Sequence, residues 1–452
     1  MQLMKSAPPF LRIALTFGAF SFVGLSTSAV LAQGANDEVI EVGGAVRSLP
    51  RVQIVPEDAG AVDAAKALGR MITSTALFVA DVRKPGDTVG GLAVRVTVTK
   101  EGAATRISAK STRADSQVRN RSVAFDPAAP AKSATSAAPR DLETARLADA
   151  VIEDLSGTRS HLSGQIIFTD AGTPGERRVV VMLGSGVQLR VASPSGVLAR
   201  GAALGQGDVV HYAAAAEGQI LRIFAEGRQD PVNVKVPGYL QSVAFTPDRT
   251  KAALVAGNVE GGALFAGNLE GTMKLVETGP GIAIGPTFSD KGELAWAAGP
   301  AAGPLRVFVD GKPVSQQGAW ATAPSFCNRE GKARVAYMVK NGNATSVVVT
   351  DLGGGGSHGA GAGAYPACSP DGRTIAASRP AQGKTPGGVF FLGDDGVAAV
   401  KVREGEAGGL RWVAGPPLPP EGLGPAGKKC PSGRRDRSES GARGASTGCL
   451  LL

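Results

Sequence analysis

The sequence is poor in the side chains that metal and hydrolytic sites most often use. Its 452 residues include three histidines and four cysteines, and aromatic residues make up 5% of the chain. His161, His211 and His358 have no histidine, cysteine or carboxylate near them at the spacing of a zinc site. Four cysteines do not make a disulfide framework in a chain of this length. These shortages argue against a zinc enzyme and against a sugar-binding face, which needs aromatic side chains.

Two glycine-rich stretches match chemical motifs, but their contexts do not fit. Residues 355–359 match G-x-S-x-G around Ser357, yet a nucleophile elbow joins a strand to a helix, and the Ala-Gly repeat that follows is a poor helix former. Residues 422–427 match a dinucleotide fingerprint without a preceding strand. Asp394 and Asp395 are expected to form a turn, with a bound ion there as the alternative. We therefore predict a protein that is not an enzyme, with no catalytic residues, cofactor or metal.

The net charge of +9 is not concentrated in a binding surface. More than half of this net positive charge lies in the two ends of the chain, residues 1–32 and 415–452. The remainder is scattered, which does not predict nucleic-acid binding.

The N-terminus has the features of a secretory signal peptide over residues 1–32. Lys5 and Arg12 precede an apolar run, and small residues end at Ala32, where we expect cleavage. The run is too short for a stable membrane span. No cysteine follows the cleavage point, so we expect neither a lipid anchor nor membrane insertion, and we place the mature protein in the periplasm.

Residues 33–160 form two further regions. Residues 33–49 are an extended segment with a β-prone patch at 39–42, expected to be either a disordered leader or a strand for a partner's sheet edge. Residues 50–160 predict a small α/β domain with strands at 51–55, 92–98 and 106–109. Apolar residues at helical spacing predict its two helices, the second capped by Gly157: Ala61, Ala64, Ala65, Leu68, Met71 and Ile72 in the first, and Leu142, Ala145, Ala148, Val151, Ile152 and Leu155 in the second.

A turn cassette repeats through the second half of the chain. Residues 365–378 contain Ser-Pro-Asp-Gly, whose residues suit a tight turn, followed by a short apolar strand. Similar cassettes occur upstream, and Phe245, Phe288 and Phe326 occupy the position that Cys368 has in this one. The spacings between these four successive positions are 43, 38 and 42 residues. A period near 40 with several short strands in each unit is typical of a β-propeller blade.

A second repeat, out of phase with the cassettes, consists of strands that end in a glycine turn. The spacings between its glycines are 31, 44, 40, 42 and 43 residues: Gly196, Gly227, Gly271, Gly311, Gly353 and Gly396. We therefore predict a mainly β protein in which residues 161–414 form a six-bladed β-propeller. The fragment 409–413, with Trp412, is expected to return to the first blade and close the ring. Residues 415–452 lack periodicity and are expected to be a disordered tail.

Cys327 and Cys368 fall near matching positions of neighbouring blades, one register step apart. In an oxidising compartment they either form a disulfide or remain two core thiols. The sequence leaves both possibilities open.

The chain resembles the TolB family of periplasmic propellers. The resemblance is carried by the junction at residues 147–168, where Ser156-Gly157-Thr158-Arg159 is similar to the family's T-G-x-R turn. Residues 40–44 and 49–56 are similar to the family's mature N-terminus and first strand. The resemblance implies a monomeric, non-catalytic connector of the Tol-Pal system, with roles in cell division and envelope integrity.

The family's partners imply two sets of contact residues. The N-terminal segment would bind TolA through Glu38, Val39, Ile40, Glu41 and Val42. The peptidoglycan-associated lipoprotein Pal would bind a rim of the propeller, for which we nominate the cassette-turn cations Arg249, Lys291, Arg329 and Arg373.

Two other classes remain as alternatives. A propeller peptidase would need an α/β-hydrolase domain of roughly 200 residues, whereas 38 residues follow Ala414. A cell-wall- or sugar-binding propeller would need more aromatic side chains than this chain has.

Overall fold

The computed structural model describes residues 49–415 apart from 114, 116, 128–138, 174–175, 216–219, 259–260, 277, 279–280, 382–385 and 397, together with the backbone of residues 40–42. The predicted signal peptide, Glu38, Val39 and nearly all of the predicted tail lie outside the described residues. In the described part the chain is mainly β, with few helices. None of the helices there is both long enough and apolar enough to span a membrane.

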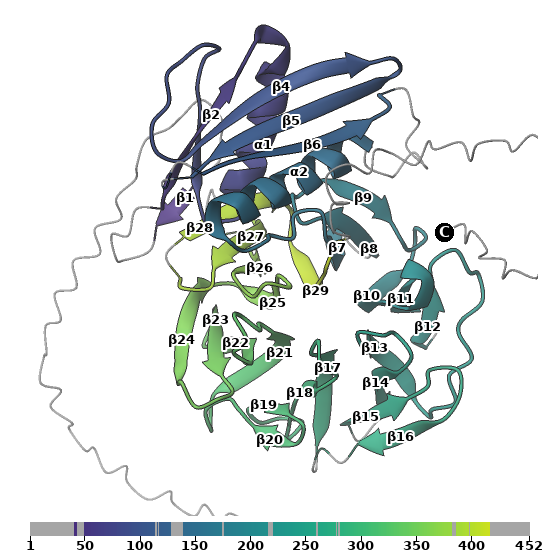
Figure 1. The fold of residues 1–452 in the computed structure, drawn as a ribbon. Coiled ribbons are helices and arrows are strands. Elements are labelled where there is room, and N and C mark those ends of the chain that lie inside the picture. Colours follow the sequence, from purple (N-terminus) through teal and green to yellow (C-terminus); the bar gives the residue numbers. More distant parts are fainter. Residues whose placement is uncertain are drawn as a thin grey trace, which may run out of the picture.

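The N-terminal part is a mixed sheet packed against two helices (Figure 1). The strand order is β3-β2-β4-β5-β6, and β2 pairs in parallel with both of its neighbours. Leu68 and Ile72 of α1 and Val151 of α2 are buried in one cluster with the sheet, as their helical spacing predicted. The elements are β2 (Arg51–Pro56), η1 (Ala59–Ala61), α1 (Val62–Ser74), β3 (Val79–Val82), β4 (Ala93–Glu101), β5 (Ala104–Thr112), β6 (Val118–Phe125) and α2 (Pro139–Ser156).

The remaining strands form consecutive antiparallel groups around a common axis, which gives a propeller-like part (Figure 1). In chain order they are β7 (Gln165–Thr173), β8 (Glu176–Leu183) and β9 (Gln188–Val191); β10 (Leu198–Leu204), η2 (Gln206–Asp208), β11 (Val210–Ala215) and β12 (Arg222–Ala225); β13 (Tyr239–Phe245), β14 (Ala252–Asn258), β15 (Gly261–Gly267) and β16 (Met273–Val276); β17 (Ile282–Phe288), β18 (Leu294–Gly299), β19 (Arg306–Val309) and β20 (Lys312–Pro313); β21 (Trp320–Phe326), β22 (Arg334–Asn341), β23 (Ala344–Asp351) and β24 (Ser357–Ala362); β25 (Ala364–Cys368), β26 (Thr374–Arg379), β27 (Gly388–Gly393) and β28 (Ala398–Glu404); and β29 (Ala407–Val413).

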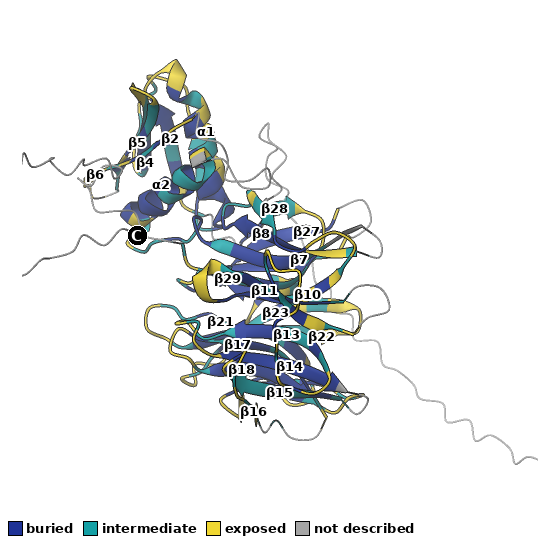
Figure 2. Ribbon diagram, turned by 90° about the vertical axis from the view of Figure 1, so that its right-hand side faces the viewer, coloured by how far each residue is buried: buried dark blue, intermediate teal, exposed yellow. Residues whose placement is uncertain are grey.

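The innermost strands follow one another around the axis in the order β29, β10, β13, β17, β21 and β25, and each contacts the next. The last of them, β29, pairs with β7 through Trp412 and Ile166, although some 240 residues separate the two strands. This pairing confirms the predicted return of residues 409–413 to the first strands of the propeller-like part. Figure 2 shows the N-terminal sheet set to one side of this part, with the buried residues concentrated in the strands.

The innermost strands share a β-bulge that the sequence repeats did not reveal. The pairing register shifts inside each of them, between residues 200 and 203, 240 and 242, 284 and 287, 322 and 325, 364 and 367, and 408 and 411. Bulges bend a strand and increase its twist, which suits strands packed around an axis.

The junction between the two parts is organised by one buried carboxylate. Asp149 on α2 has no exposed surface and accepts hydrogen bonds from Ser160 Oγ at 2.6 Å, Leu162 N at 2.7 Å, and Ser163 N and Oγ at 3.0 and 2.6 Å. Gly157, at φ +76°, ends the helix as predicted. The carboxylate thereby fixes the direction in which the chain leaves α2 for β7.

Strand β1 (Ile40–Val42) lies on the edge of the chain's own sheet. It pairs antiparallel with β28, with Ile40 opposite Val400 and Val42 opposite Ala398. Part of the predicted β-prone patch is thus a strand, paired with the edge of the chain's own sheet.

Candidate functional site

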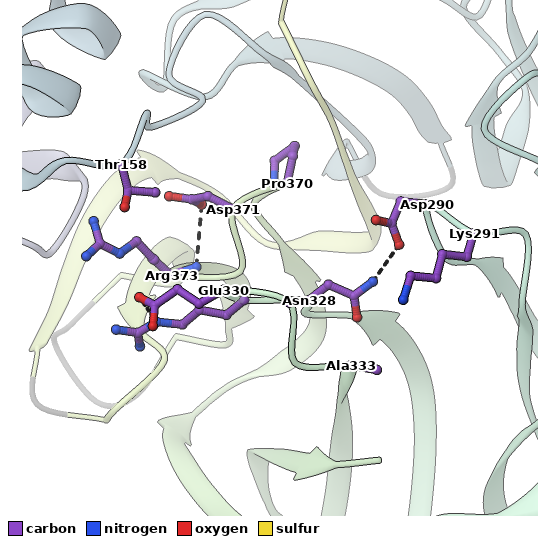
Figure 3. Close-up of a pocket in the computed structure, with 11 residues that line it drawn as sticks. Thr158, Asp290, Lys291, Asn328, Glu330, Ala333, Pro370, Asp371 and Arg373 are labelled. Atoms are coloured by element: carbon purple, nitrogen blue, oxygen red, sulfur yellow. Dashed lines mark hydrogen bonds and ion pairs between the residues drawn. The ribbon is translucent and has the colours of Figure 1, made fainter. Parts of the chain in front are cut away.

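The cassette turns bring three of the four nominated cations around one pocket of about 290 Å³ (Figure 3). Lys291, Arg329 and Arg373 each follow an innermost strand, β17, β21 or β25, so their turns gather at the same end of the propeller-like part. Thr158 from the α2–β7 junction also lines this pocket, which we call the rim pocket. Arg249 does not line it and instead pairs with Asp208.

The charges of the rim pocket differ in how firmly they are held. Arg373 Nη1 donates to Ser156 Oγ at 3.2 Å, and Arg329 Nη1 pairs with Asp394 at 2.8 Å. Burial disfavours the Arg329 cation, but hydrogen bonds and charge from Asp394 outweigh this effect and raise the pKa of Arg329. Lys291, in contrast, makes no side-chain ion pair with any described residue. Lys291 is therefore the nominated cation that is available to a ligand.

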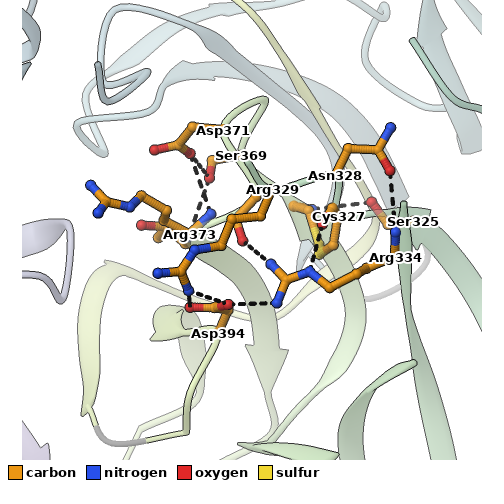
Figure 4. Close-up of a disulfide and its surroundings, with 12 residues drawn as sticks. Ser325, Cys327, Asn328, Arg329, Arg334, Ser369, Asp371, Arg373 and Asp394 are labelled. Atoms are coloured by element: carbon orange, nitrogen blue, oxygen red, sulfur yellow. Dashed lines mark hydrogen bonds and ion pairs between the residues drawn. A yellow bond between two sulfur atoms is a disulfide. The ribbon is translucent and has the colours of Figure 1, made fainter. Parts of the chain in front are cut away.

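An asparagine connects the pocket wall to the strands behind it. Asn328 Nδ2 donates to Asp290 Oδ1 at 2.5 Å (Figure 3). Asn328 Oδ1 accepts from the backbone N of Arg334 at 3.2 Å (Figure 4). The bond to Asp290 ties two successive cassette turns together, and the bond to Arg334 lies within the β21–β22 hairpin.

Asp394 stabilises the rim pocket from behind (Figure 4). Its side chain is buried and pairs with both Arg329 and Arg334, whose Nη1 lies 2.9 Å from Asp394 Oδ2. The remaining donors of Arg334 reach the carbonyl oxygens of Cys327 at 3.1 Å and Gly372 at 2.9 Å. Asp394 and Asp395 lie in a turn, as expected. Asp394 has a further role that the turn pattern did not indicate, because its ion-pair partners Arg334 and Arg329 lie 60 and 65 residues away in the chain. Among the described residues, no three His, Cys, Asp or Glu side chains gather as a metal site would require.

Cys327 and Cys368 form a disulfide between neighbouring innermost strands. Their Cα atoms are 5.3 Å apart, within the usual range for a disulfide. Cys368 N also donates to Ser325 Oγ at 3.1 Å, so the two strands are linked by a side-chain hydrogen bond next to the bridge. The sequence left open a disulfide or two core thiols, and the structure has the disulfide.

Ser357 is not in a nucleophile elbow. It opens strand β24, and its hydroxyl lies 2.7 Å from Thr350 Oγ1. His358 Nε2 is 2.8 Å from the backbone oxygen of Asp394 rather than near Ser357 Oγ. Burial lowers the pKa of both His161 and His211.

Two aromatic side chains that the sequence motifs did not indicate are exposed at the start of innermost strands. Trp320 begins β21 and is 40% exposed, and Tyr365 in β25 is 42% exposed. Arg411 on β29 donates to the carbonyl oxygen of Pro286 at 2.6 Å, and burial lowers its pKa to about 10. The repeats did not indicate these roles, because a repeat spacing identifies strands and turns but not which side chains of a strand are exposed.

No family model matches the chain, and no curated protein matches it by sequence. A TolB structure from Acinetobacter baumannii is similar over 83% of this chain and 99% of its own, with 14% identity and a TM-score of 0.66. The fold is TolB-like. A second TolB-type structure, from Agrobacterium tumefaciens, matches over 54% of this chain and 90% of its own, with 12% identity and a TM-score of 0.42. An oligogalacturonate lyase from Vibrio parahaemolyticus matches over 53% and 74%, with 11% identity and a TM-score of 0.34.

Proposed function

We propose that the chain is a non-catalytic periplasmic connector of the Tol-Pal type. In this proposal residues 161–414 are a closed six-bladed propeller, residues 50–160 are a separate small α/β domain, and residues 1–32 are removed on export. The observation that carries the proposal is the TolB-like fold, which spans 99% of the Acinetobacter TolB chain. The family's role then implies a contribution to outer-membrane constriction during division and to envelope integrity.

The partners in this proposal are Pal at the propeller and TolA at the N-terminal segment. A non-catalytic role is supported by Ser357, which opens a strand rather than standing in a nucleophile elbow and whose hydroxyl lies against Thr350 Oγ1. The strand character of residues 40–42 supports the TolA assignment, because a short strand is suited to pairing with a partner's sheet edge. Glu38, Val39, Ile40, Glu41 and Val42 are the residues that we assign to this contact.

For Pal we propose the rim pocket, with Lys291 as the main contact. Lys291 has no ion pair among the described residues, so it reaches a partner's carboxylate without losing an internal bond. Arg329 and Arg373 would act mainly by holding the shape of the pocket, since both bind within the chain. Arg249 would lie at the margin of the contact.

The test is a calorimetric titration of the mature protein with the soluble domain of the cognate Pal. We expect Lys291→Glu to weaken binding by about tenfold, because it replaces an attraction with a repulsion in the contact. Lys312→Glu is the matched control, since Lys312 is exposed on strand β20, away from the rim pocket.

A third variant, Trp320→Ala, distinguishes an error in the proposed Pal-binding site from an error in the proposed function. If Trp320→Ala weakens Pal binding and Lys291→Glu does not, the partner binds the opposite end of the innermost strands and the rim-pocket assignment is wrong. If the unaltered protein fails to bind Pal at all, the Tol-Pal proposal itself is wrong.

A further inference from the structure

The N-terminal sheet has an edge strand beside a cationic groove. Among the described strands, β3 is the last of its sheet and pairs only with β2. Helix α1 runs alongside, and a groove of about 420 Å³ lies between the two elements. We call it the α1–β3 groove and define it by Val62, Lys66 and Arg70 of α1 together with Ala80, Val82 and Lys84.

The backbone of β3 still has hydrogen-bonding capacity at this edge. Val79 N donates to the carbonyl oxygen of Pro50, just before β2, at 3.0 Å, and Arg83 N donates to that of Ile54 in β2 at 2.8 Å. The alternate residues Ala80 and Val82 therefore direct their backbone groups outward. Thr73 Oγ1 on α1 accepts from Ala80 N at 3.0 Å. The N–H of Val82 has no such side-chain partner among the described residues, which leaves it to pair with an added strand.

The groove is narrow at its base and apolar there. Gly69 faces β3, and a Cβ at this position would come within 2.8 Å of Val82 Cγ2, so the missing side chain lets the helix approach the strand. Val82 itself is 36% exposed. An extended chain with small apolar side chains fits such a base better than a bulky or helical ligand does.

The walls of the groove carry positive charge without matching acids. Lys66, Arg70 and Lys84 are exposed and make no side-chain ion pair with any described residue. Arg83 is the groove cation that is neutralised, by Asp81 at 2.7 Å. In the described part of the chain, no carboxylate lines the groove. The ligand that complements this surface is therefore acidic.

We propose that the α1–β3 groove binds an extended acidic segment of a partner protein, which adds as a strand to the free edge of β3. Main-chain hydrogen bonds to Val82 would supply affinity, and alternating carboxylates on the segment would meet Lys66, Arg70 and Lys84. This site is separate from the rim pocket and does not depend on the Tol-Pal proposal.

The test uses the full mature protein and fluorescence anisotropy. The probe is a labelled peptide of about eight residues that alternates Glu with Val, and its control is the same peptide with Lys in place of Glu. We expect the acidic peptide to bind at least about tenfold more tightly than the basic one. The double variant Lys66→Glu/Arg70→Glu should abolish this preference, whereas Lys110→Glu, an exposed lysine on β5, should leave it unchanged.

Strand addition is tested separately from charge. Val82→Pro removes an outward N–H without removing a bond to β2, because proline is tolerated at a solvent-facing edge position. We expect it to weaken binding, while Val82→Ala should not. The same bonds can be tested on the unaltered protein with two peptides, one N-methylated at its odd residues and the other at its even residues. We expect one of the two to bind weakly, because in one of them the methyl groups replace the N–H groups that face β3.

Three results would overturn the proposal. One is equal binding of the acidic and basic peptides, and another is unchanged binding to Lys66→Glu/Arg70→Glu. The third is a different specificity: the acidic peptide binds neither the unaltered protein nor the double variant, but the unaltered protein binds anionic vesicles or nucleic acid and the double variant does not. That result would make the groove a general polyanion surface.

Discussion

Single buried polar residues hold this molecule together at the points where its parts meet. Asp149 satisfies four donors at the junction. Burial raises the pKa of this carboxyl, and the serine and backbone donors partly oppose that effect. Asp394 does similar work for two arginines behind the rim pocket. In each case one buried acidic side chain binds several donors at once, and it satisfies groups such as Leu162 N and the Arg334 guanidinium that would otherwise be buried without partners.

We expect Asp149→Asn to lower the free energy of unfolding by about 3 kcal/mol, because an amide NH₂ would face donors that need an acceptor. Urea unfolding followed by tryptophan fluorescence measures the change. Glu153→Gln on the exposed side of the same helix is the control and should leave the midpoint unchanged. Equal midpoints for Asp149→Asn and the unaltered protein would show that the junction does not depend on this carboxylate.

At the scale of elements, neighbouring innermost strands are held by more than packing. β21 and β25 are linked by the Cys327–Cys368 disulfide and by Ser325. The guanidinium of Arg334 then bonds the carbonyl oxygens of Cys327 and Gly372, on either side of the bridge. The bridge, the cassette turn and the Asp394 ion pairs therefore form one unit that shapes the rim pocket.

The double variant Cys327→Ser/Cys368→Ser should lose about 2–4 kcal/mol of stability, since the bridge closes a loop of some 40 residues in the unfolded chain. The measurement is the urea midpoint with and without reductant. Reductant should lower the midpoint of the unaltered protein and leave that of the double variant where it is. A reductant-insensitive midpoint in the unaltered protein would contradict a stabilising bridge.

The sequence predicted the elements whose signal is local. Helical spacing identified α1, and the cassettes identified the turns that follow β17, β21 and β25. Strand β3 was missed because its four residues are specified by pairing with β2 rather than by their own pattern. The partners of Asp394 and the position of β1 on β28 were missed for the same reason, since both depend on residues that are distant in sequence.

At the scale of the whole molecule, the N-terminal sheet and the propeller-like part are joined at more than the α2–β7 junction. Thr374 Oγ1, just after a cassette turn, donates to Thr75 O at the end of α1 at 2.9 Å. Ala76 packs with Ala398 and Val400 of β28, the strand that also carries β1. The segment proposed to bind TolA therefore lies beside the contact between the two parts, on the outer edge of a sheet.

The central claim, a connector with two separate partner sites, is tested most directly by deleting residues 33–44 from the mature protein. Calorimetric titration of both forms with the Pal domain and the TolA C-terminal domain gives the answer. The proposal predicts that both forms bind Pal with equal affinity and that the deletion abolishes TolA binding. It is contradicted if neither form binds either partner, or if TolA binds equally well without the segment.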